Sequence, residues 1–294
     1  MLHTDPITQS GGFIDSAQAL RELQGSHHEF QWTDSDFQRI RSLIRQKAGI
    51  DLREGRQAMV YSRLSRRLRE TGHRSFRVYL DDLERNDGQE WQEFINALTT
   101  NLTAFFREQH HFDVLAKYLR SGPSSVNWRI WCAAASTGEE AYSIAMTVRE
   151  TLGDARRYQL LSSDIDTRVL ATAKAGMYKL DELKGLSPER MARHFQRGNG
   201  SNAGLIRVKS ELQKQMEFFQ LNLNDDNWVL PEPFDVVFCR NVMIYFDAAT
   251  QARILQRLHR VLRPGGLLFV GHSENFRDAS DLFALQGKTV YARL

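Results

Sequence analysis

The chain has 294 residues, of which 41% are hydrophobic and 26% charged, a composition that excludes disordered, collagen-like and disulfide-scaffold proteins. The longest apolar runs, such as Leu267 to Val270, are far shorter than the ~20 residues that span a bilayer, and no basic segment followed by an apolar core opens the chain. Cys132 and Cys239 are the only cysteines, and both lie in apolar runs that predict buried strands. We therefore expect a cytoplasmic protein with reduced thiols and no metal site.

This length predicts about two domains, at ~150 residues per domain. Residues 1–28 are expected to form a flexible tail. From Thr33, a candidate N-cap, apolar residues such as Phe37, Ile40 and Ile44 recur at helical spacing, and the pattern continues to Leu83. Residues 29–85 are thus predicted to form a helical domain, and 86–99 a linker helix that leads to a second domain over 100–294.

The predicted helical domain is strongly basic, although the whole chain carries a net charge of only +3. Twelve Arg and Lys residues and three acidic residues occur between Arg39 and Arg77. In a helix predicted from Met59, with Gly72 as its C-cap, one face is apolar and the opposite face carries Arg63, Arg66, Arg67 and Arg69. Such a face attracts nucleic acid phosphates or a carboxylate-rich protein surface, or is simply solvated.

From residue 126 onward, short strands and helices alternate. Strands are predicted over 126–132, 158–163, 234–239 and 267–271, and helices over 139–152, 166–175 and 250–262. This order indicates an α/β fold with a doubly wound, mostly parallel sheet, whose ligands bind at the carboxyl ends of the strands. Residues 177–215 interrupt the alternation and predict a small antiparallel hairpin insertion, and residues 289–294 are expected to form an antiparallel edge strand.

The turn after the first predicted strand reads Ala133-Ala-Ala-Ser-Thr-Gly-Glu-Glu. It lacks the G-x-G-x-x-G pattern of dinucleotide-binding folds, and Glu139 and Glu140 would repel a phosphate. A ligand that carries a cationic group and a nucleoside but no phosphate fits better, and S-adenosylmethionine (SAM) has this composition. The alternative is that Ser136 with Glu139, or Thr137 with Glu140, forms a capping box.

Polar residues follow the other predicted strands as well. Asp164 lies at the spacing from which an acid accepts hydrogen bonds from ribose hydroxyls, whereas Asp166 is the better candidate for an N-cap. Arg240 and Asn241 leave the apolar run at the same sheet edge.

Three further motifs are interpreted as chance matches. Gly287-Lys-Thr lacks the first glycine of a phosphate loop, and Gly271-His-Ser-Glu-Asn lacks the last glycine of a hydrolase nucleophile elbow. His110 and His111 are adjacent, which favours positions on a helix surface over metal ligation.

Together, six segments resemble the CheR family of bacterial chemotaxis receptor methyltransferases, from about Trp32 to the C-terminus. They are Asn101-Leu-Thr-Ala-Phe-Phe-Arg, Ala133-Ala-Ala-Ser-Thr-Gly-Glu-Glu, Ser163-Asp-Ile-Asp, Phe238-Cys-Arg-Asn-Val-Met-Ile-Tyr-Phe, Leu262-Arg-Pro-Gly-Gly and Gly271-His-Ser-Glu-Asn-Phe. The resemblance implies a class I SAM-dependent methyltransferase fold and methyl transfer from SAM to chemoreceptor glutamates. It also implies a monomer that neither binds nucleic acid nor inserts into a membrane.

The resemblance further implies roles for particular residues. Arg107 and Tyr245 would face the reacting carboxylate. The cofactor would be bound by Asn101, Thr103, Arg107, Glu140, Asp164, Asn222, Leu223, Arg240 and Asn241. Arg63, Arg66 and Arg67 would read acidic receptor helices, and the insertion would bind a C-terminal receptor pentapeptide through Arg197, Gly198, Gly200 and Arg207. A plain connecting hairpin is the alternative for the insertion.

Two departures from the family pattern remove no expected ligand: Ala141 replaces a proline, and Asn199 replaces a threonine. The competing function is a nucleic acid methyltransferase that binds RNA through its basic helices. Asn241-Val-Met-Ile, in place of an Asn-Pro-Pro-Tyr amine site, argues against it. A receptor-binding module without turnover is a further alternative.

Overall fold

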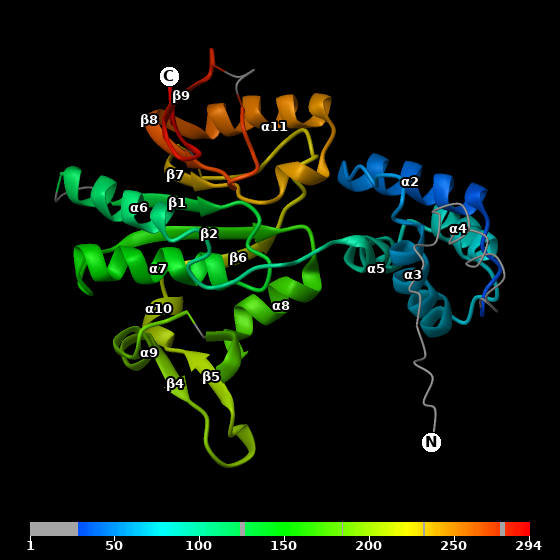
Figure 1. The fold of residues 1–294 in the computed structure, drawn as a ribbon, viewed down its shortest axis with the longest axis horizontal. Helices are drawn as coiled ribbons and strands as arrows, with labels where there is room; N and C mark the ends of the chain where they lie inside the picture. Colours follow the sequence, from blue (N-terminus) through cyan, green and yellow to red (C-terminus); the bar gives the residue numbers. More distant parts are fainter. Residues whose placement is uncertain (1–28, 124–126, 184, 232, 277–279) are drawn as a thin grey trace, which may run out of the picture.

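The computed structural model describes residues 29–123, 127–183, 185–231, 233–276 and 280–294. The tail predicted over 1–28 lies outside these residues. Figure 1 shows a helical N-terminal part beside a larger α/β part, from which a small antiparallel sheet projects.

The helical part consists of α2 (Asp34–Ala48), α3 (Gln57–Thr71), α4 (Phe76–Arg85) and α5 (Gln89–Leu98). Thr33 caps α2 as predicted: its hydroxyl accepts from Asp36 N at 3.2 Å, and Asp36 accepts from Thr33 N at 2.9 Å. Gly72 ends α3 in the left-handed conformation, which was also predicted. Phe94 and Leu98 of α5 are buried in the same core as the other three helices, so this core extends through Leu98.

The α/β part is built on a seven-stranded sheet with the order β6-β2-β1-β7-β8-β10-β9. The strands are β1 (Trp128–Cys132), β2 (Tyr158–Asp164), β6 (Met216–Gln220), β7 (Phe234–Phe238), β8 (Leu262–Phe269), β9 (Phe283–Gly287) and β10 (Val290–Arg293). The first five in sheet order pair in parallel, and β10 pairs antiparallel with both β8 and β9. The predicted α/β class is confirmed.

Two details of the predicted sheet differ. The last strand is antiparallel as expected, but its edge position is wrong, because β9 lies outside it. Neither β9 nor β6 was predicted. Both are edge strands with partly exposed residues, so they lack the apolar run that marks a buried strand.

Helices cover both faces of this sheet. α6 (His110–Ser121) and α7 (Glu139–Leu152) pack on the face that contains Ile130 and Cys132, and α11 (Ala248–Val261) packs on the face that contains Trp131. α8 (Thr167–Ala175) follows β2. Because the parallel strands all run the same way, the loops that follow β1, β2 and β7 meet at one edge of the sheet.

The insertion forms a separate three-stranded antiparallel sheet with the order β3-β5-β4, below the large sheet in Figure 1. It comprises β3 (Met177–Lys179), η1 (Leu180–Leu183), α9 (Pro188–His194), β4 (Phe195–Arg197), η2 (Gly200–Asn202), β5 (Leu205–Val208) and α10 (Ser210–Gln213). A hairpin insertion with a helix of its own was predicted, and the additional strand β3 comes from the three residues that follow the C-cap of α8. Arg190 of α9 pairs with Glu150 of α7 at 2.9 Å, which joins the insertion to the main fold.

The helical and α/β parts are joined by two groups of contacts. In the first, Asp166 accepts from the Thr99 hydroxyl at 2.6 Å and from Asn101 Nδ2 at 2.8 Å. In the second, Asp51 N donates to the carbonyl of Tyr245 at 2.8 Å, and Asn222 Nδ2 donates to the Lys47 carbonyl at 2.8 Å. The helical part is thus fixed against the edge at which the strand-end loops meet.

Across the described ranges, no helix combines the length and apolar character needed to cross a membrane.

Candidate active site

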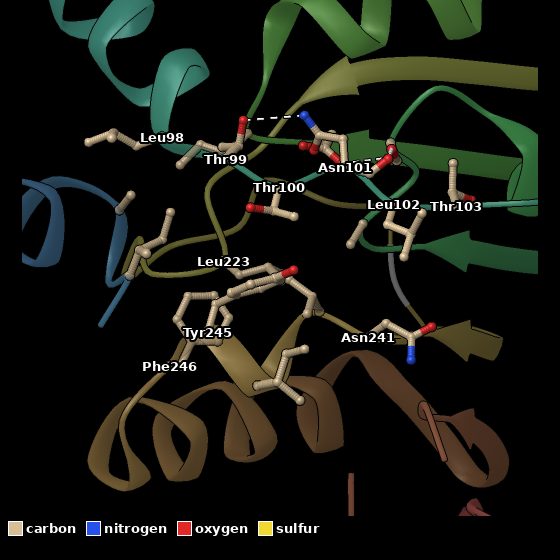
Figure 2. Close-up of a pocket in the computed structure, with 18 of the residues that line it drawn as sticks. Leu98, Thr99, Thr100, Asn101, Leu102, Thr103, Leu223, Asn241, Tyr245 and Phe246 are labelled. Atoms are coloured by element: carbon tan, nitrogen blue, oxygen red, sulfur yellow. Dashed lines mark hydrogen bonds between the residues drawn. The ribbon is translucent and has the colours of Figure 1, made fainter. Parts of the chain in front are cut away.

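A pocket opens at the carboxyl ends of β1, β2 and β7. Figure 2 shows residues 98–103 along one side and Leu223, Tyr245 and Phe246 along the other. The helical part supplies a further wall through Ile50, Met59 and Arg63. Both parts of the chain therefore enclose the pocket.

The residues for which a cofactor or catalytic role was predicted come together in this pocket. Its lining includes Asn101, Thr103, Arg107, Glu140, Asp164, Asn222, Leu223, Arg240, Asn241 and Tyr245. They come from segments that are far apart in the sequence. Their contacts with a ligand stay predictions.

Asp164 ends β2 and is 8% exposed. Its carboxylate accepts hydrogen bonds from Ser136 N at 2.8 Å and from Asp166 N at 3.0 Å. Burial raises the pKa of Asp164 to about 6. Asp166, in contrast, caps α8 through Arg168 N and Val169 N, as predicted, so Asp164 is not needed as a helix cap.

Glu140 and Arg240, which both line the pocket, form a buried ion pair. Glu140 Oε2 lies 2.8 Å from Arg240 Nη1, and Arg240 Nη2 donates to the Arg107 carbonyl at 2.5 Å. Burial raises the pKa of Glu140, and the nearby guanidinium of Arg240 acts in the opposite direction. Arg240 Nε is buried and has no hydrogen-bond partner among the described residues.

The capping boxes considered for α7 do not form. Gly138, with φ of +101°, occupies the N-cap, and the Thr137 hydroxyl donates to the Glu139 carboxylate at 2.6 Å. Both predicted capping boxes are wrong: each requires Ser136 or Thr137 at the N-cap, but Gly138 occupies that position. Glu140 is consequently available for the pair with Arg240.

The two predicted catalytic side chains lie on different segments of the pocket wall. Arg107 donates to the Leu102 carbonyl at 2.9 Å and forms no ion pair with any described residue. Tyr245 ends the short helix η3 (Met243–Tyr245), which follows Asn241, a residue with φ of +57°. A tight turn after β7 therefore brings Tyr245 to the pocket.

The three arginines of α3 that were predicted to face a receptor have different surroundings. Arg63 lines the pocket and donates to the Thr99 carbonyl at 2.6 Å. The side chain of Arg66 is 72% exposed and pairs with Glu70 at 2.9 Å. The exposed position predicted for Arg67 is wrong: it is buried and pairs with Glu90 of α5 at 2.6 Å. Arg67 lies next to the apolar face of α3, where α5 packs against the helix and buries this side chain.

The residues predicted to bind a receptor peptide lie on the small sheet. Arg197 is opposite Ile206, and Arg207 is opposite Gln196, so the two exposed arginines point to opposite faces. Gly198 approaches another backbone segment closely, since a Cβ there would lie 2.1 Å from the Asn202 carbonyl oxygen. Gly200 has φ of +54°.

The prediction that both adjacent histidines lie on a helix surface is wrong for His111, which is fully buried against Phe269. Burial lowers the pKa of His111 to about 4. Ligand atoms of Glu108, His110 and His111 lie within 4.8 Å of one another. Arg240 Nη2 is 3.4 Å from Glu108 Oε1 and already supplies positive charge to this carboxylate, so we assign the cluster to the arginine network.

Some pocket residues were not predicted. Arg53, Arg56 and Met59 line it from the helical part, and Leu102 and Ile244 contribute exposed apolar side chains. The basic charge of residues 39–77 was recognised in the sequence, but its position beside the strand ends depends on how the two parts pack. Glu274 is a buried carboxylate in the segment Gly271-His-Ser-Glu-Asn, which carried part of the family resemblance, but no role was predicted for Glu274 itself.

The pocket fits SAM in its chemistry. Two buried acids, Glu140 and Asp164, face a space where a cationic amino acid moiety and a ribose would each find a carboxylate, and Ala133 and Ala134 leave room beside the backbone. The turn after β1 is not the glycine-rich loop of a phosphate site. A doubly wound sheet with such an acidic, phosphate-free site at its strand ends defines the SAM-dependent methyltransferases.

Comparisons with known proteins identify the family within this class. The model of the CheR methyltransferase SAM-binding domain matches residues 101–292, and that of the CheR methyltransferase all-alpha domain matches residues 35–99. The chain belongs to the CheR methyltransferase family, and SAM is its cofactor.

Relatives in several bacteria are similar over most of their length. A chemotaxis protein methyltransferase of Escherichia coli (strain K12) is 53% identical over 262 residues, which cover 88% of this chain and 91% of that protein. One of Klebsiella aerogenes is 54% identical and covers 97% of both chains. Chemotaxis protein methyltransferase 2 of Pseudomonas aeruginosa is 49% identical and covers 90% of this chain and 95% of that protein.

Proposed function

We propose that this protein transfers methyl groups from SAM to glutamate side chains of chemoreceptors and so forms glutamate methyl esters. The observation that carries the proposal is the single pocket in which all the residues of the predicted cofactor and catalytic set meet. The relatives are named chemotaxis protein methyltransferases, which supports a chemoreceptor as the methyl acceptor.

In this proposal the cofactor is bound mainly by acidic and amide side chains. Glu140, paired with Arg240, accepts from the cationic amino group, and Asp164 accepts from the ribose hydroxyls. Asn222 and Leu223 flank the base. When bound, SAM would supply a methyl carbon on a positively charged sulfur, and an acceptor carboxylate oxygen could bond to this carbon while the sulfur leaves with the electrons of the broken bond.

The acceptor glutamate needs no general base, because its ordinary pKa of ~4.3 leaves it ionised at neutral pH. The work of the protein is therefore alignment, which is worth up to ~7–11 kcal/mol in favourable systems. Arg107 has no carboxylate partner among the described residues and can pair with the acceptor. Tyr245, which also lines the pocket, can fix its orientation with one hydrogen bond.

Receptor docking is assigned to basic side chains around the pocket mouth. Arg63 and Arg66 of α3 remain candidates, whereas buried Arg67 does not. Arg53 and Arg56 line the pocket, are exposed, and have no ion-pair partner among the described residues. Acidic receptor helices would meet this surface first. We further infer that the protein acts as a monomer in the cytoplasm, where its two free, buried cysteines would stay reduced.

Tethering through a receptor C-terminal pentapeptide is proposed for the small sheet, with β4 as the open edge to which an extended peptide can add. Arg197 and Arg207 would then contact opposite sides of the peptide. Titration with the pentapeptide tests this idea: Arg197→Ala and Arg207→Ala should each weaken binding several-fold, and wild-type affinity in both variants would contradict it.

The main experiment follows tritiated methyl transfer to membranes that contain receptor. We expect base-labile label on wild-type receptor and none on a receptor whose acceptor glutamates are replaced by alanine. Total RNA serves as an alternative acceptor in the same assay. Label on RNA, or label on receptor that survives base, would contradict the proposed function.

A further inference from the structure

A buried carboxylate lies directly behind the pocket wall, on a segment for which no role has been described above. Glu274 follows β8, is 4% exposed, and is not among the described residues that line the pocket. Its motif, Gly271-His-Ser-Glu-Asn, is one of the segments that resemble the CheR family, but the sequence assigned no role to Glu274 itself. We propose that Glu274 is a positioning residue that fixes the loop carrying Asn241 and Tyr245, an inference that rests on the proposed function.

The carboxylate of Glu274 is bound by the backbone of that loop. Oε2 accepts from Asn241 N at 2.9 Å and from Gly271 N at 2.5 Å, and Oε1 accepts from Met243 N at 2.8 Å. Both oxygens are therefore used, and each faces an N–H donor. A glutamine could present only one oxygen, so its amide group would face at least one of these donors.

The loop needs such an acceptor because of its shape. Asn241 has φ of +57°, so the chain turns sharply after β7 and its N–H groups cannot continue the sheet ladder. Buried N–H groups require partners, and Glu274 supplies them from the neighbouring strand end.

Gly271 allows the two segments to approach. A Cβ at this glycine would lie 2.2 Å from Asn241 Nδ2 and 2.9 Å from Asn241 N. Gly271 and Glu274 thus act on the same residue, one by leaving space and the other by accepting its N–H.

Tyr245 is held from both sides of the loop. Glu274 binds Met243 N at the start of η3, and Asp51 N binds the Tyr245 carbonyl at its end. The Tyr245 hydroxyl forms no hydrogen bond with another described residue, so a shift of η3 would move the phenol relative to the acceptor carboxylate. Misplacement of a reacting or orienting group by about 1 Å can lower turnover by up to about 100-fold.

The test compares Glu274→Gln with a matched control, Asp235→Asn. Asp235 of β7 is also a buried carboxylate: it accepts from Arg129 N at 2.7 Å and pairs with Arg263 at 2.8 Å, but it lies at the end of β7 that is remote from Asn241. Melting temperature, affinity for S-adenosylhomocysteine and kcat with saturating receptor are measured for both. We expect both variants to lose stability, and only Glu274→Gln to lose about tenfold or more in kcat.

A double-mutant cycle with Tyr245→Phe distinguishes positioning from general loosening. If Glu274 acts through Tyr245, Glu274→Gln should lower kcat by less than about threefold in the Tyr245→Phe background. Equal factors in both backgrounds would overturn the inference, as would a folded Glu274→Gln protein with wild-type kcat or a kcat loss matched by Asp235→Asn.

Gly271→Ala provides a second variant should Glu274→Gln fail to fold. It displaces Asn241 while leaving the carboxylate intact, and the same loss of kcat is expected. A folded Gly271→Ala protein with wild-type kcat would overturn the inference. A wild-type protein that transfers no methyl to receptor would overturn the proposed function and this inference together, whereas the outcomes above overturn only the inference.

Discussion

Asp164 is a buried carboxylate that makes no ion pair with any described residue and accepts hydrogen bonds from backbone N–H groups, among them those of Ser136 and Asp166. A group in these surroundings resists ionisation, which explains why its pKa is raised to about 6. Ribose hydroxyls would complete its hydrogen bonding and favour the ionised form. Ligand affinity should therefore depend on the protonation of this one side chain.

We expect affinity for S-adenosylhomocysteine to fall as the pH is lowered through about 6. The folded pKa is raised, so protonation of the free protein begins to compete with the ligand below that pH, at up to tenfold per pH unit. Calorimetric titration between about pH 8 and pH 5 measures the effect. Asp164→Asn should bind more weakly and give a flatter profile; a profile as steep as that of the wild type would assign the proton to another group, with Glu140 the next candidate.

Arg107 and Tyr245 should differ in their effects on binding and turnover. Tyr245→Phe removes one hydroxyl and should lower kcat by about 10-fold to 100-fold while affinity for S-adenosylhomocysteine stays within about twofold. Arg107→Ala should lower kcat and also weaken cofactor binding, because Arg107 borders both reactants in the proposed geometry. Unchanged methyl transfer in either variant would remove that residue from the mechanism.

At the scale of elements, α3 shows which features of a helix its own sequence predicts and which depend on neighbouring helices. Its apolar face and its glycine cap followed from the sequence pattern around Val60, Leu64 and Leu68, whereas the helix begins at Gln57, two residues before the predicted Met59. The burial of Arg67 did not, because Glu90 belongs to another helix whose position no local pattern encodes. The same limit applies to β9, whose pairing with β10 depends on contacts outside its own five residues.

Arg66→Ala and Arg67→Ala should therefore separate docking from stability. Arg67→Ala leaves Glu90 without its cation and should lower the free energy of unfolding by about 2 kcal/mol, less than for a fully buried pair because Glu90 is partly exposed. Arg66→Ala should change it by less than about 0.5 kcal/mol but reduce receptor methylation. Urea unfolding and receptor methylation, measured for both variants, test these expectations. A larger loss of stability in Arg66→Ala than in Arg67→Ala would contradict the assignment.

The candidate site was largely predictable where it depends on sheet topology. Asp164, Arg240 and Asn241 follow strands, and parallel strands bring their carboxyl ends together whatever the rest of the fold does. The wall formed by Arg53 and Met59 was not predictable, since it depends on polar contacts between the two parts, such as Thr99 with Asp166. Nothing in the local sequence around Thr99 or Asp166 indicates which residue each one contacts.

For the whole molecule, the distribution of charge and burial predicts that salt weakens receptor docking much more than it weakens cofactor binding. Arg53 and Arg56 of the pocket lining are exposed, whereas the Glu140–Arg240 pair is buried and screened much less. Raising the ionic strength from about 0.05 M to about 0.5 M should lower kcat/KM for receptor several-fold and change the affinity for S-adenosylhomocysteine by less than about twofold. A parallel loss in both would exclude electrostatic docking.

The backbone contact between Asp51 and Tyr245 carries a practical lesson for anyone who engineers this enzyme. The helical part contributes residues to the pocket, so it cannot be exchanged without changing the active site. Exchanging it between relatives to redirect the enzyme toward other receptors would also rebuild one side of the cofactor chamber. Grafts that keep residues 48–63 native and vary only the outer helical surface should preserve turnover.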